Sequence, residues 1–207
     1  MIDMVKERIS LRKKHAMMTR QAIYNAGISL ISRKGYYRVT IDDICTKAGV
    51  SRGTFYSHFK SKDAIVLEQF LKLDAYYNET VAREMQSKRT AEEKLLAFTR
   101  GVTSYLIQMG VSGIKVAYQS QIGAERGESS QVASEERSLY TLIKAAVVLG
   151  QKKGEIRNDM TADEITRTVI RTERGVIFDW CLTNGGFDLE KESMRMFTLV
   201  SEGIRSK

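Results

Sequence analysis

Side chains suited to binding nucleic acid gather between Thr40 and Lys62, around the segment AGVSRGTFYSHFKSK that starts at Ala48. Phe55 and Phe59 are four residues apart, so they share one face of a helix. We expect that face to pack on apolar neighbours, which turns the polar side chains of the segment outward. The chemistry that such an outward face can do is recognition of base edges and phosphates by donors held on a short helix.

The residue types divide this outward face into two roles. Arg52 and Thr54 are the candidates to reach base edges, arginine toward guanine and threonine toward a thymine methyl group or a phosphate. Tyr56 and His58 carry donors without sequence preference, which suits phosphate contacts. Gly53 has no side chain, so DNA or another helix could approach the backbone closely there.

Phosphate contacts are also expected at both ends of the segment. Ser51 can cap the helix that follows it, and its hydroxyl and the first N–H groups of that helix would point at a phosphate. Thr40 and Lys62 would hold phosphates on either side of a major groove about 12 Å wide. The predicted DNA-binding residues are Thr40, Ser51, Arg52, Gly53, Thr54, Tyr56, His58 and Lys62.

Three helices must position these residues. The first shows apolar residues at helical spacing and ends at the sequence RKG, where Gly35 suits a left-handed cap. Thr40 caps the second helix, with Asp43 near its positive end. Gly49 breaks that helix, and Ser51 caps the third. Two short helices joined by a glycine-containing turn predict a helix-turn-helix.

Positive charge is concentrated in the same part of the chain. The net charge is +8 over 207 residues. Residues 1–62 hold 13 Lys/Arg and 4 Asp/Glu, a balance of +9, and the other 20 Lys/Arg and 21 Asp/Glu leave −1 for the rest. This asymmetry indicates a polyanion-binding module joined to a neutral body, although a merely solvated basic face is the alternative.

The remaining sequence predicts longer helices. It contains no proline, and apolar residues recur at spacings of three and four. Capping boxes are expected at Thr90 with Glu93 and at Thr161 with Glu164. The predicted fold is all-α, with a helix-turn-helix DNA-binding domain at 1–62 and a larger helical domain for effector binding and dimerisation at 63–207. The expected helices of the larger domain span 62–87, 90–109, 112–121, a segment that reaches 153 after the polar loop GAERGESSQ, 161–182 and 188–204.

Several classes of function are excluded by what the sequence lacks. Only two cysteines and two histidines occur, and they are far apart, so we expect no disulfide framework, metal site or catalytic triad. No nucleophile–base pair or phosphate-cradling loop is present, so neither an enzyme nor a cofactor is expected. No apolar run is long enough to span a bilayer, and the N-terminus lacks the pattern of a signal peptide, which predicts a cytoplasmic protein.

The ordered residues TIDDICTKAGVSRGTFYSHFKSKDAI resemble the DNA-binding signature of the TetR family of bacterial transcription regulators. With the preceding helix and its GYYRVT exit, the resemblance covers residues 19–67. It lies in the threonine cap of the second helix, A-G-V-S at the turn, G-T-F-Y, then H-F and S-K. The resemblance implies an all-α homodimer with two DNA-binding heads, ligand-binding bodies, and repression relieved by a small molecule.

The larger domain carries no motif of comparable strength. Aromatic rings at helical spacing are more often core than pocket, so its rings alone do not identify a ligand site. Tyr105, Met109 and Tyr118 are the candidate ligand-binding residues, because they flank the helix break GVSG, where irregular backbone can open a cavity. The resemblance implies such a pocket, and no residue pattern identifies the ligand.

The last two predicted helices are the candidate dimer interface. An apolar seam on each, repeated by a two-fold axis, would form a four-helix bundle. The alternative is that both helices complete the core of one chain. The seam residues are Val169, Val176, Ile177, Trp180, Met196, Leu199, Val200 and Ile204.

Together these patterns predict a homodimeric repressor that binds double-stranded DNA at a pseudo-palindromic operator and is released by an unidentified small-molecule effector. One alternative is a regulator that binds DNA constitutively or nonspecifically, without a ligand. Another is a basic helical protein that binds a membrane surface or a protein partner. The basic segment VKERISLRKKHAMM is expected to extend the first helix, although it could be an arm that enters a minor groove.

Overall fold

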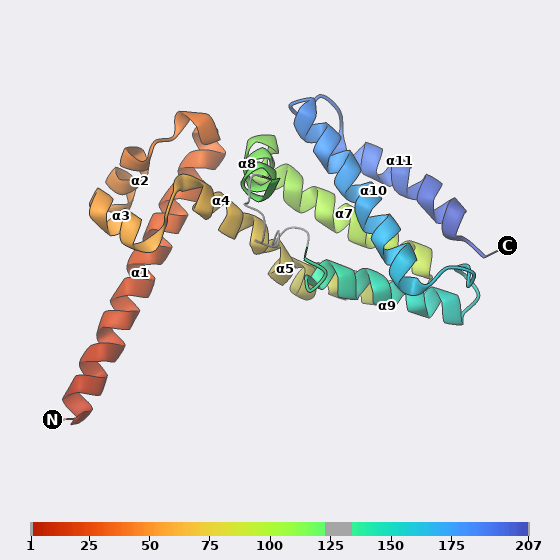
Figure 1. Ribbon diagram of the computed structural model, residues 1–207, viewed down its shortest axis with the longest axis horizontal. Helices are drawn as coiled ribbons and strands as arrows, with labels where there is room; N and C mark the ends of the chain where they lie inside the picture. The colour runs from red at the N-terminus through yellow and green to blue at the C-terminus, as the bar shows by residue number, and fades with distance from the viewer. Residues whose placement is uncertain (1, 123–133, 207) are drawn as a thin grey trace. The chain divides into compact units, whose positions relative to one another are not determined.

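The computed structural model describes residues 2–122 and 134–206, with only the backbone for residues 2–10, 120 and 121. The part of the chain that it describes is helical, apart from turns and one isolated antiparallel bridge between Ile156 and Arg205, which confirms the predicted all-α fold (Figure 1). Two compact units form, residues 1–69 and 70–207, and the boundary lies inside helix α4 (Lys62–Leu71). The predicted loop GAERGESSQ lies outside the described residues.

The first unit is a helix-turn-helix domain. Its helices α2 and α3 both pack against α1, whose N-terminal half extends away from them (Figure 1). The basic segment before Thr19 continues α1 as helix back to Ile2. The centre of the core is Ile23, Ile44 and Phe55, all of them fully buried. The elements are α1 (Ile2–Lys34), the 3-10 turn η1 (Tyr36–Arg38), α2 (Ile41–Ala48), α3 (Arg52–His58) and most of α4.

Local capping groups set the ends of α2 and α3. The hydroxyl of Thr40 accepts from the Asp43 N–H at 3.1 Å, and the Asp43 carboxylate accepts from the Thr40 N–H at 2.8 Å, which completes a capping box. Gly49 ends α2 in the left-handed conformation, with φ 67° and ψ 36°. Ser51 then caps α3 by accepting from the Thr54 N–H at 3.1 Å. These contacts confirm the predicted helix ends. Gly35 differs, because its φ of 81° comes with a ψ of 150°, outside the left-handed helical region.

The second unit is a bundle of longer helices. Within it α7 packs against α6, α9 and α11, and α10 packs against α9 and α11. Capping boxes at Thr90 with Glu93 and at Thr161 with Glu164 start α7 and α10, as predicted. Its elements are α5 (Leu73–Tyr76), the π-helix η2 (Tyr77–Val81), α6 (Ala82–Ser87), α7 (Ala91–Met109), α8 (Val111–Ile122), α9 (Ser138–Lys152), α10 (Ala162–Leu182) and α11 (Leu189–Ile204).

The single helix predicted over 62–87 is wrong, because that span is divided into α4, α5, η2 and α6. The hydrogen bonds of a π-helix join residues five apart in place of four, and apolar spacing does not reveal this change. Packing against α7 accompanies it: the ring of Tyr77 lies 5.3 Å from that of Phe98. Val81 also lies so close to Gly101 that a Cβ there would be 2.7 Å from its Cγ2. Tertiary contacts with α7 therefore override the continuous helical pattern.

Candidate functional site

A buried aromatic pair holds α3 against the rest of the first unit. Phe55 is fully buried and Phe59 is 3% exposed, with their ring centroids 6.2 Å apart. The guanidinium of Arg20 lies 4.5 Å from the centre of the Phe59 ring and pairs with the carboxylate of Glu68. The predicted apolar back of the segment is therefore in place, and it fixes which side of α3 faces outward.

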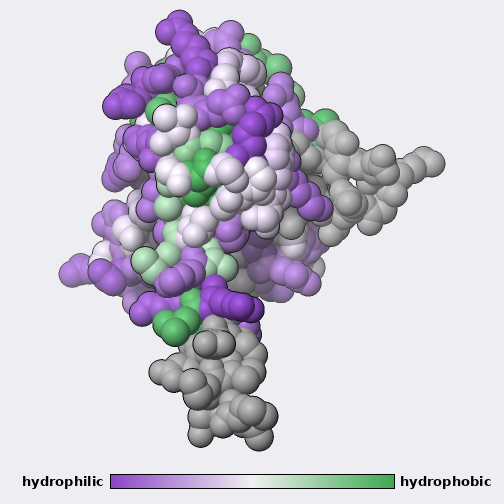
Figure 2. Space-filling model, turned by 90° about the vertical axis from the view of Figure 1, so that its left-hand side faces the viewer, coloured by the Kyte–Doolittle hydropathy of each residue, from purple (hydrophilic) through white to green (hydrophobic). Residues whose placement is uncertain are grey.

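The outward side of α3 carries the predicted contact residues. Arg52, Gly53 and Tyr56 are exposed, and Thr54 and His58 are half-buried. A Cβ at Gly53 would meet only the Ser51 hydroxyl, at 3.7 Å, so the backbone there is open to a close approach. Figure 2 views this side of the molecule and shows hydrophilic side chains over most of it, around a smaller apolar area.

Arg52 is oriented by an ion pair with α2. Its Nη1 lies 2.7 and 2.8 Å from the two carboxylate oxygens of Asp42. Both side chains are exposed, so the pair is weak in water and the guanidinium can exchange its partner. Asp42 thus holds Arg52 at the front of the unit without burying its charge.

Lys62 is placed differently from the other cations. Its Nζ donates to the carbonyl oxygens of Tyr36 at 2.8 Å and Val39 at 2.6 Å, and it lies 3.9 Å from the centre of the Tyr36 ring. Burial lowers its pKa. The Tyr36 hydroxyl in turn donates to Asp63. Lys62 therefore fastens the η1 turn to the start of α4, a role that sequence reasoning missed.

Tyr37 is a second residue that sequence reasoning missed. It lies on η1, shortly before the Thr40 cap, and is 69% exposed. A large ring that is so exposed beside a cationic face is available for contact with a partner. The two adjacent tyrosines in GYYRVT, which follows the first helix, were the sequence feature that could have drawn attention to it. In the structure Tyr36 contacts Lys62 and Asp63, whereas the ring of Tyr37 is exposed.

A small cavity of about 30 Å³ lies inside the second unit. Of the three predicted ligand-binding residues, only Tyr118 lines it. Tyr105 lies with its ring 5.1 Å from that of Tyr76, and Met109 lies against Gly113. The wall residues are Phe70, Leu73, Tyr77, Phe98, Val102, Leu106, Tyr118, Arg137, Leu139, Ile170, Glu173, Arg174 and Ile177.

Glu173 is the unexpected member of this wall. It lies on α10, and its Oε1 is buried without a hydrogen-bond partner among the described residues. Burial raises its pKa to about 8, against a smaller opposing effect of the Ser193 hydroxyl. No sequence signal singled it out, because TERG in the middle of an amphipathic helix reads as a polar face.

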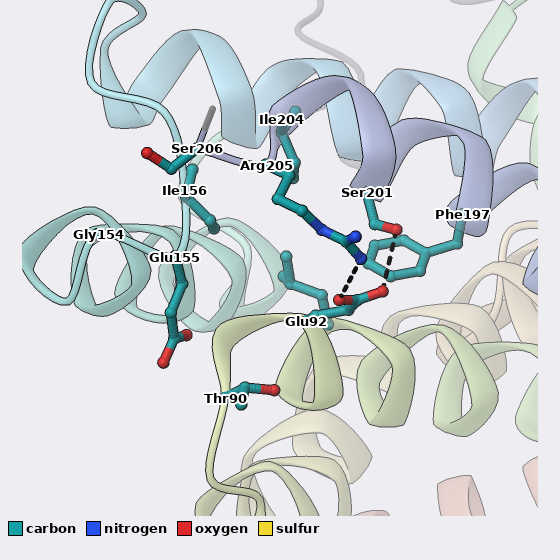
Figure 3. A pocket seen from close by; sticks show the side chains of 11 residues that line it. Thr90, Glu92, Gly154, Glu155, Ile156, Phe197, Ser201, Ile204, Arg205 and Ser206 are labelled. Atoms are coloured by element: carbon teal, nitrogen blue, oxygen red, sulfur yellow. Dashed lines mark hydrogen bonds and ion pairs between the residues drawn. The ribbon is translucent and has the colours of Figure 1, made fainter.

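A second, larger pocket of about 270 Å³ lies between the start of α7, the turn after α9 and the end of α11 (Figure 3). Its carboxylates have partners. Glu92 accepts from Arg205 Nη2 at 3.0 Å and from the Ser201 hydroxyl at 3.2 Å, as Figure 3 shows. Glu155 accepts from the Ala91 N–H at 2.6 Å. This pocket therefore offers apolar volume but no unpaired carboxylate.

The predicted dimer seams are partly used inside the unit. Val169, Val176, Ile177, Trp180 and Ile204 are buried within it, which is the core role considered as the alternative. Met196 and Val200 are half-buried, and Leu199 is 55% exposed. The exposed apolar side chains of α10 are instead Phe178 and Leu182, which the seam prediction left out.

Neither a metal centre nor a membrane span is found in the described chain. No group of three or more His, Cys, Asp or Glu side chains there is arranged to hold an ion. None of the described helices combines the length and hydropathy required to cross a bilayer.

Comparison with known proteins gives a family match for the helix-turn-helix and more distant relatives over most of the chain. Residues 15–68 match the family described as bacterial regulatory proteins, tetR family. Over 186 residues the chain is 24% identical to the fatty acid metabolism regulator protein of Bacillus subtilis, covering 89% of this chain and 95% of that one.

Two solved structures share the fold. The TetR-family repressor FadR of Thermus thermophilus, in complex with lauroyl-CoA, has a TM-score of 0.71 at 23% identity and covers 91% of this chain and 96% of its own. A putative transcriptional regulator from Saccharomonospora viridis, in complex with choline, has a TM-score of 0.70 at 22% identity, covering 92% and 100%. The capped helix-turn-helix at residues 15–68 is thus a DNA-binding domain of the TetR family of bacterial transcription regulators, and the helical body shares the fold of these structures.

Proposed function

We propose that the chain is a repressor that binds a pseudo-palindromic operator as a homodimer and leaves it when a small molecule binds the second unit. The observation that carries the DNA-binding part is the geometry of α3. Phe55 and Phe59 anchor one side of this helix in the core, while Arg52 and Tyr56 are exposed on the other. The first unit therefore presents a short, rigid helix of a size that a major groove admits.

On DNA, Arg52 is proposed to exchange its partner Asp42 for a base edge, with Thr54 beside it. Tyr56 and His58 are proposed as phosphate donors. Thr40 and Ser51 use their hydroxyl oxygens as helix caps, and their contact with phosphate would come through the hydroxyl protons and nearby backbone N–H groups.

Lys62 is proposed to contact phosphate only through the N–H donor of its ammonium group that is not bound to the carbonyls of Tyr36 and Val39. An ammonium has three donors, and two hydrogen bonds to these carbonyls are present. Lys62 thus combines a bracing role with a weaker electrostatic one.

Release by a ligand is proposed because relatives with this fold hold small molecules, lauroyl-CoA in one and choline in another. The ligand would bind in the cavity that Tyr118 lines. Helix α4 begins in the first unit and ends in the second, so it is the proposed lever by which a ligand shifts the population away from the DNA-binding spacing. A ligand that binds without changing operator affinity would contradict this mechanism.

Dimerisation is proposed through the outer surfaces of α10 and α11, where Leu199, Phe178 and Leu182 are exposed. An open groove beside Val176 and Met196 continues this surface. A two-fold repeat of such a surface is an isologous contact that yields two heads for two half-sites. We propose a cytoplasmic regulator without enzyme activity, since its work is on the chromosome.

The decisive experiment is selection of bound sequences from a random duplex pool by the purified protein at about 150 mM salt, where nonspecific binding is weak. Enrichment of a palindrome is expected, and it would yield the operator for ligand screening. Salt-sensitive bulk binding without enrichment would overturn the sequence-specific function. It would leave a nonspecific polyanion binder, and anionic vesicles would then be the next partner to test.

A further inference from the structure

The cavity of the second unit combines an uncompensated carboxylate with aromatic walls. Oε1 of Glu173 is buried and has no hydrogen-bond partner among the described residues. A buried polar atom left in this state costs free energy, so natural proteins keep few of them. Such an atom beside a cavity indicates a partner that arrives from outside the chain.

Four aromatic rings line the same cavity as this carboxylate, in two pairs. Phe70 and Tyr118 lie edge to face with centroids 6.2 Å apart, and Tyr77 and Phe98 lie 5.3 Å apart at a tilt of 32°. Ring faces attract a cation, and the attraction grows when water is excluded. The walls thus favour the same sign of charge as the carboxylate.

The two arginines of the cavity wall are already engaged by other groups. Arg137 Nε lies 3.0 and 3.3 Å from the carboxylate oxygens of Asp74, and its guanidinium is 5.3 Å from the Phe70 ring. Arg174 Nη1 donates to the Tyr140 hydroxyl at 3.2 Å, and its guanidinium is 5.7 Å from the ring of the same tyrosine. Oε1 of Glu173 has no hydrogen-bond partner among the described residues, so the cavity has a carboxylate to offer a ligand.

We infer that the cavity selects a ligand whose buried end is an organic cation, such as an ammonium group, with Glu173 as its counter-ion and the four rings as its walls. The inference rests on the proposed function, in which the effector binds in this cavity. It adds the chemical class of the effector. Proteins of the same fold hold ligands of opposite charge, an acyl-CoA in one and choline in another, so the fold alone does not indicate that class.

Other occupants fit the wall less well. A metal ion such as Ca²⁺ or Mg²⁺ requires about six oxygen ligands, and the wall supplies one carboxylate among rings and aliphatic side chains. An anion would meet the Glu173 carboxylate, and the arginines of the wall already contact Asp74 and Tyr140. A neutral ligand could accept a hydrogen bond from protonated Glu173. The variant Glu173→Gln distinguishes this alternative from cation binding, because it keeps a hydrogen-bond donor and cannot carry charge.

The cavity is small at present and must widen to admit a ligand. Its room of about 30 Å³ is enough for one or two waters. Two of its walls contain backbone that departs from the α-helix: Tyr77 begins the π-helix η2, and Gly110, with φ 78°, separates α7 from α8. π-helical turns occur often at functional sites. We expect the cavity to widen by movement of the wall at η2 or at the break between α7 and α8.

Glu173 makes the binding of a permanent cation dependent on pH. Burial raises its pKa to about 8, so it is largely protonated at pH 7 and must lose the proton when a cation binds. The phenols of Tyr77 and Tyr118 have pKa values raised by burial, that of Tyr118 to about 12, so they keep their protons in this range. Arg137 and Arg174 are the cationic side chains of the same wall. Affinity for a quaternary ammonium should therefore rise about tenfold from pH 7 to pH 9.

The test is calorimetric titration of the full-length protein with choline, with benzyltrimethylammonium, and with 3,3-dimethylbutan-1-ol, the uncharged counterpart of choline. We expect at least one cation to bind, the alcohol to bind at least tenfold more weakly than choline, and binding at pH 7 to release close to one proton. Proton release is read from buffers of different ionisation enthalpy, so it needs no variant. Absence of binding by both cations, or equal binding of choline and the alcohol, would overturn the inference.

Glu173→Gln keeps the size and a hydrogen-bond donor but cannot carry charge. It should lose at least tenfold in cation affinity and all of the proton release, whereas Glu202→Gln, an exposed change of the same charge on α11, should bind like the wild type. Retained affinity in Glu173→Gln would show that the carboxyl acts as a neutral donor and would contradict the counter-ion role.

Operator binding by the same preparations, without any probe, separates the inference from the proposed function. If no preparation binds a selected duplex, the proposed function fails and the cation titrations still decide the chemistry of the cavity. If the duplex is bound and the cations are not, only the inference fails. If both bind, addition of the bound cation to the complex shows whether it releases the DNA.

Discussion

The two units carry their candidate sites in opposite ways. In the first unit, the outward residues of α3 come from one short segment, and each is accessible because Phe55 and Phe59 hold the helix by its other side. In the second unit, the cavity is assembled from residues far apart in the chain, such as Phe70, Tyr118 and Glu173. A contact surface for DNA can thus be encoded locally, whereas a ligand cavity depends on how distant helices meet.

A similar contrast separates two of the pockets of the second unit. The larger pocket has carboxylates that are bound by its own walls, as in the contacts of Glu92 with Arg205 and Ser201 (Figure 3). The smaller one has Glu173, whose Oε1 lacks such a contact among the described residues. Between these two, volume favours the pocket at Glu92, and the unsatisfied carboxylate favours the cavity at Glu173. Binding specificity follows the polar groups that a ligand can satisfy.

The largest effect is expected from truncating the anchor of α3. Phe55→Ala removes a fully buried ring and should cost about 3–5 kcal/mol of stability in the first unit, with loss of DNA binding. Tyr56→Ala, its exposed neighbour, should leave stability within about 0.5 kcal/mol and weaken DNA binding only. Chemical denaturation followed by operator titration measures both. Equal loss of stability in the two variants would remove the distinction between anchor and contact face.

The next effect concerns Glu173 and the stability of the protein against pH. Its pKa of about 8 in the folded state is above the reference value of 4.5, so folding retains a proton that unfolding releases. The stability due to this proton is complete below about pH 4.5 and is lost as the pH rises to about 8. Each pH unit in this window should remove at most about 1.4 kcal/mol from the wild type.

Glu173→Gln lacks this titration. Its free energy of unfolding should therefore rise relative to that of the wild type between about pH 5 and pH 8, and the difference should stay constant at higher pH. Urea unfolding at a series of pH values provides the measurement, with Glu202→Gln as the matched control. Parallel curves for wild type and Glu173→Gln across the whole range would mean that Glu173 is not held in an apolar cavity.

Arg52 should have a smaller but more specific effect. Arg52→Ala is expected to weaken operator binding by about 1–3 kcal/mol and to relax the preference at one base pair. Asp42→Asn frees the guanidinium from its partner at 2.7 Å and should retain that base preference. Titration of operators mutated at each position reads both variants. If Arg52→Ala weakened operator and random DNA equally, its assignment to a base edge would be incorrect.

The smallest effect on DNA affinity is expected at Lys62. Lys62→Ala should weaken binding to all sequences alike and lower the salt slope by about one. It should also destabilise the first unit by about 1–2 kcal/mol, because two carbonyls lose a charged donor. Lys60→Ala, at an exposed position nearby, controls for loss of charge alone. Binding measured over a salt series, together with thermal unfolding, separates the bracing role from the electrostatic one.

Much of the first unit could be predicted from its sequence because its determinants are short-range. The caps at Thr40 and Ser51 and the turn at Gly49 each involve residues at most three or four apart, and each is found where the pattern indicates. The bracing role of Lys62 could not be predicted, since its carbonyl partners lie 23 and 26 positions earlier in the chain. Helix periodicity contains no information on such a contact.

The second unit shows the limits of the same reasoning. The capping boxes at Thr90 and Thr161 start helices where they should. The apolar seams of α10 and α11 do not distinguish buried residues from exposed ones. Val169 and Trp180 are buried inside the unit, and Leu199 is exposed. An apolar stripe indicates that a helix packs on something, and it does not say whether the partner is the same chain or another one.

By itself the sequence determined the all-α class, the capped starts of α2, α3, α7 and α10 and the outward face of α3, because capping, glycine turns and 3.6-residue periodicity act between near neighbours. Only the tertiary structure decided that η2 interrupts the helix after α5, that Lys62 is a brace, and that Oε1 of Glu173 is buried beside a ring-lined cavity without a hydrogen-bond partner among the described residues. These features depend on the distances at which separate helices pack, since burial and the pairing of charges are set by neighbours that the chain brings together only when it folds.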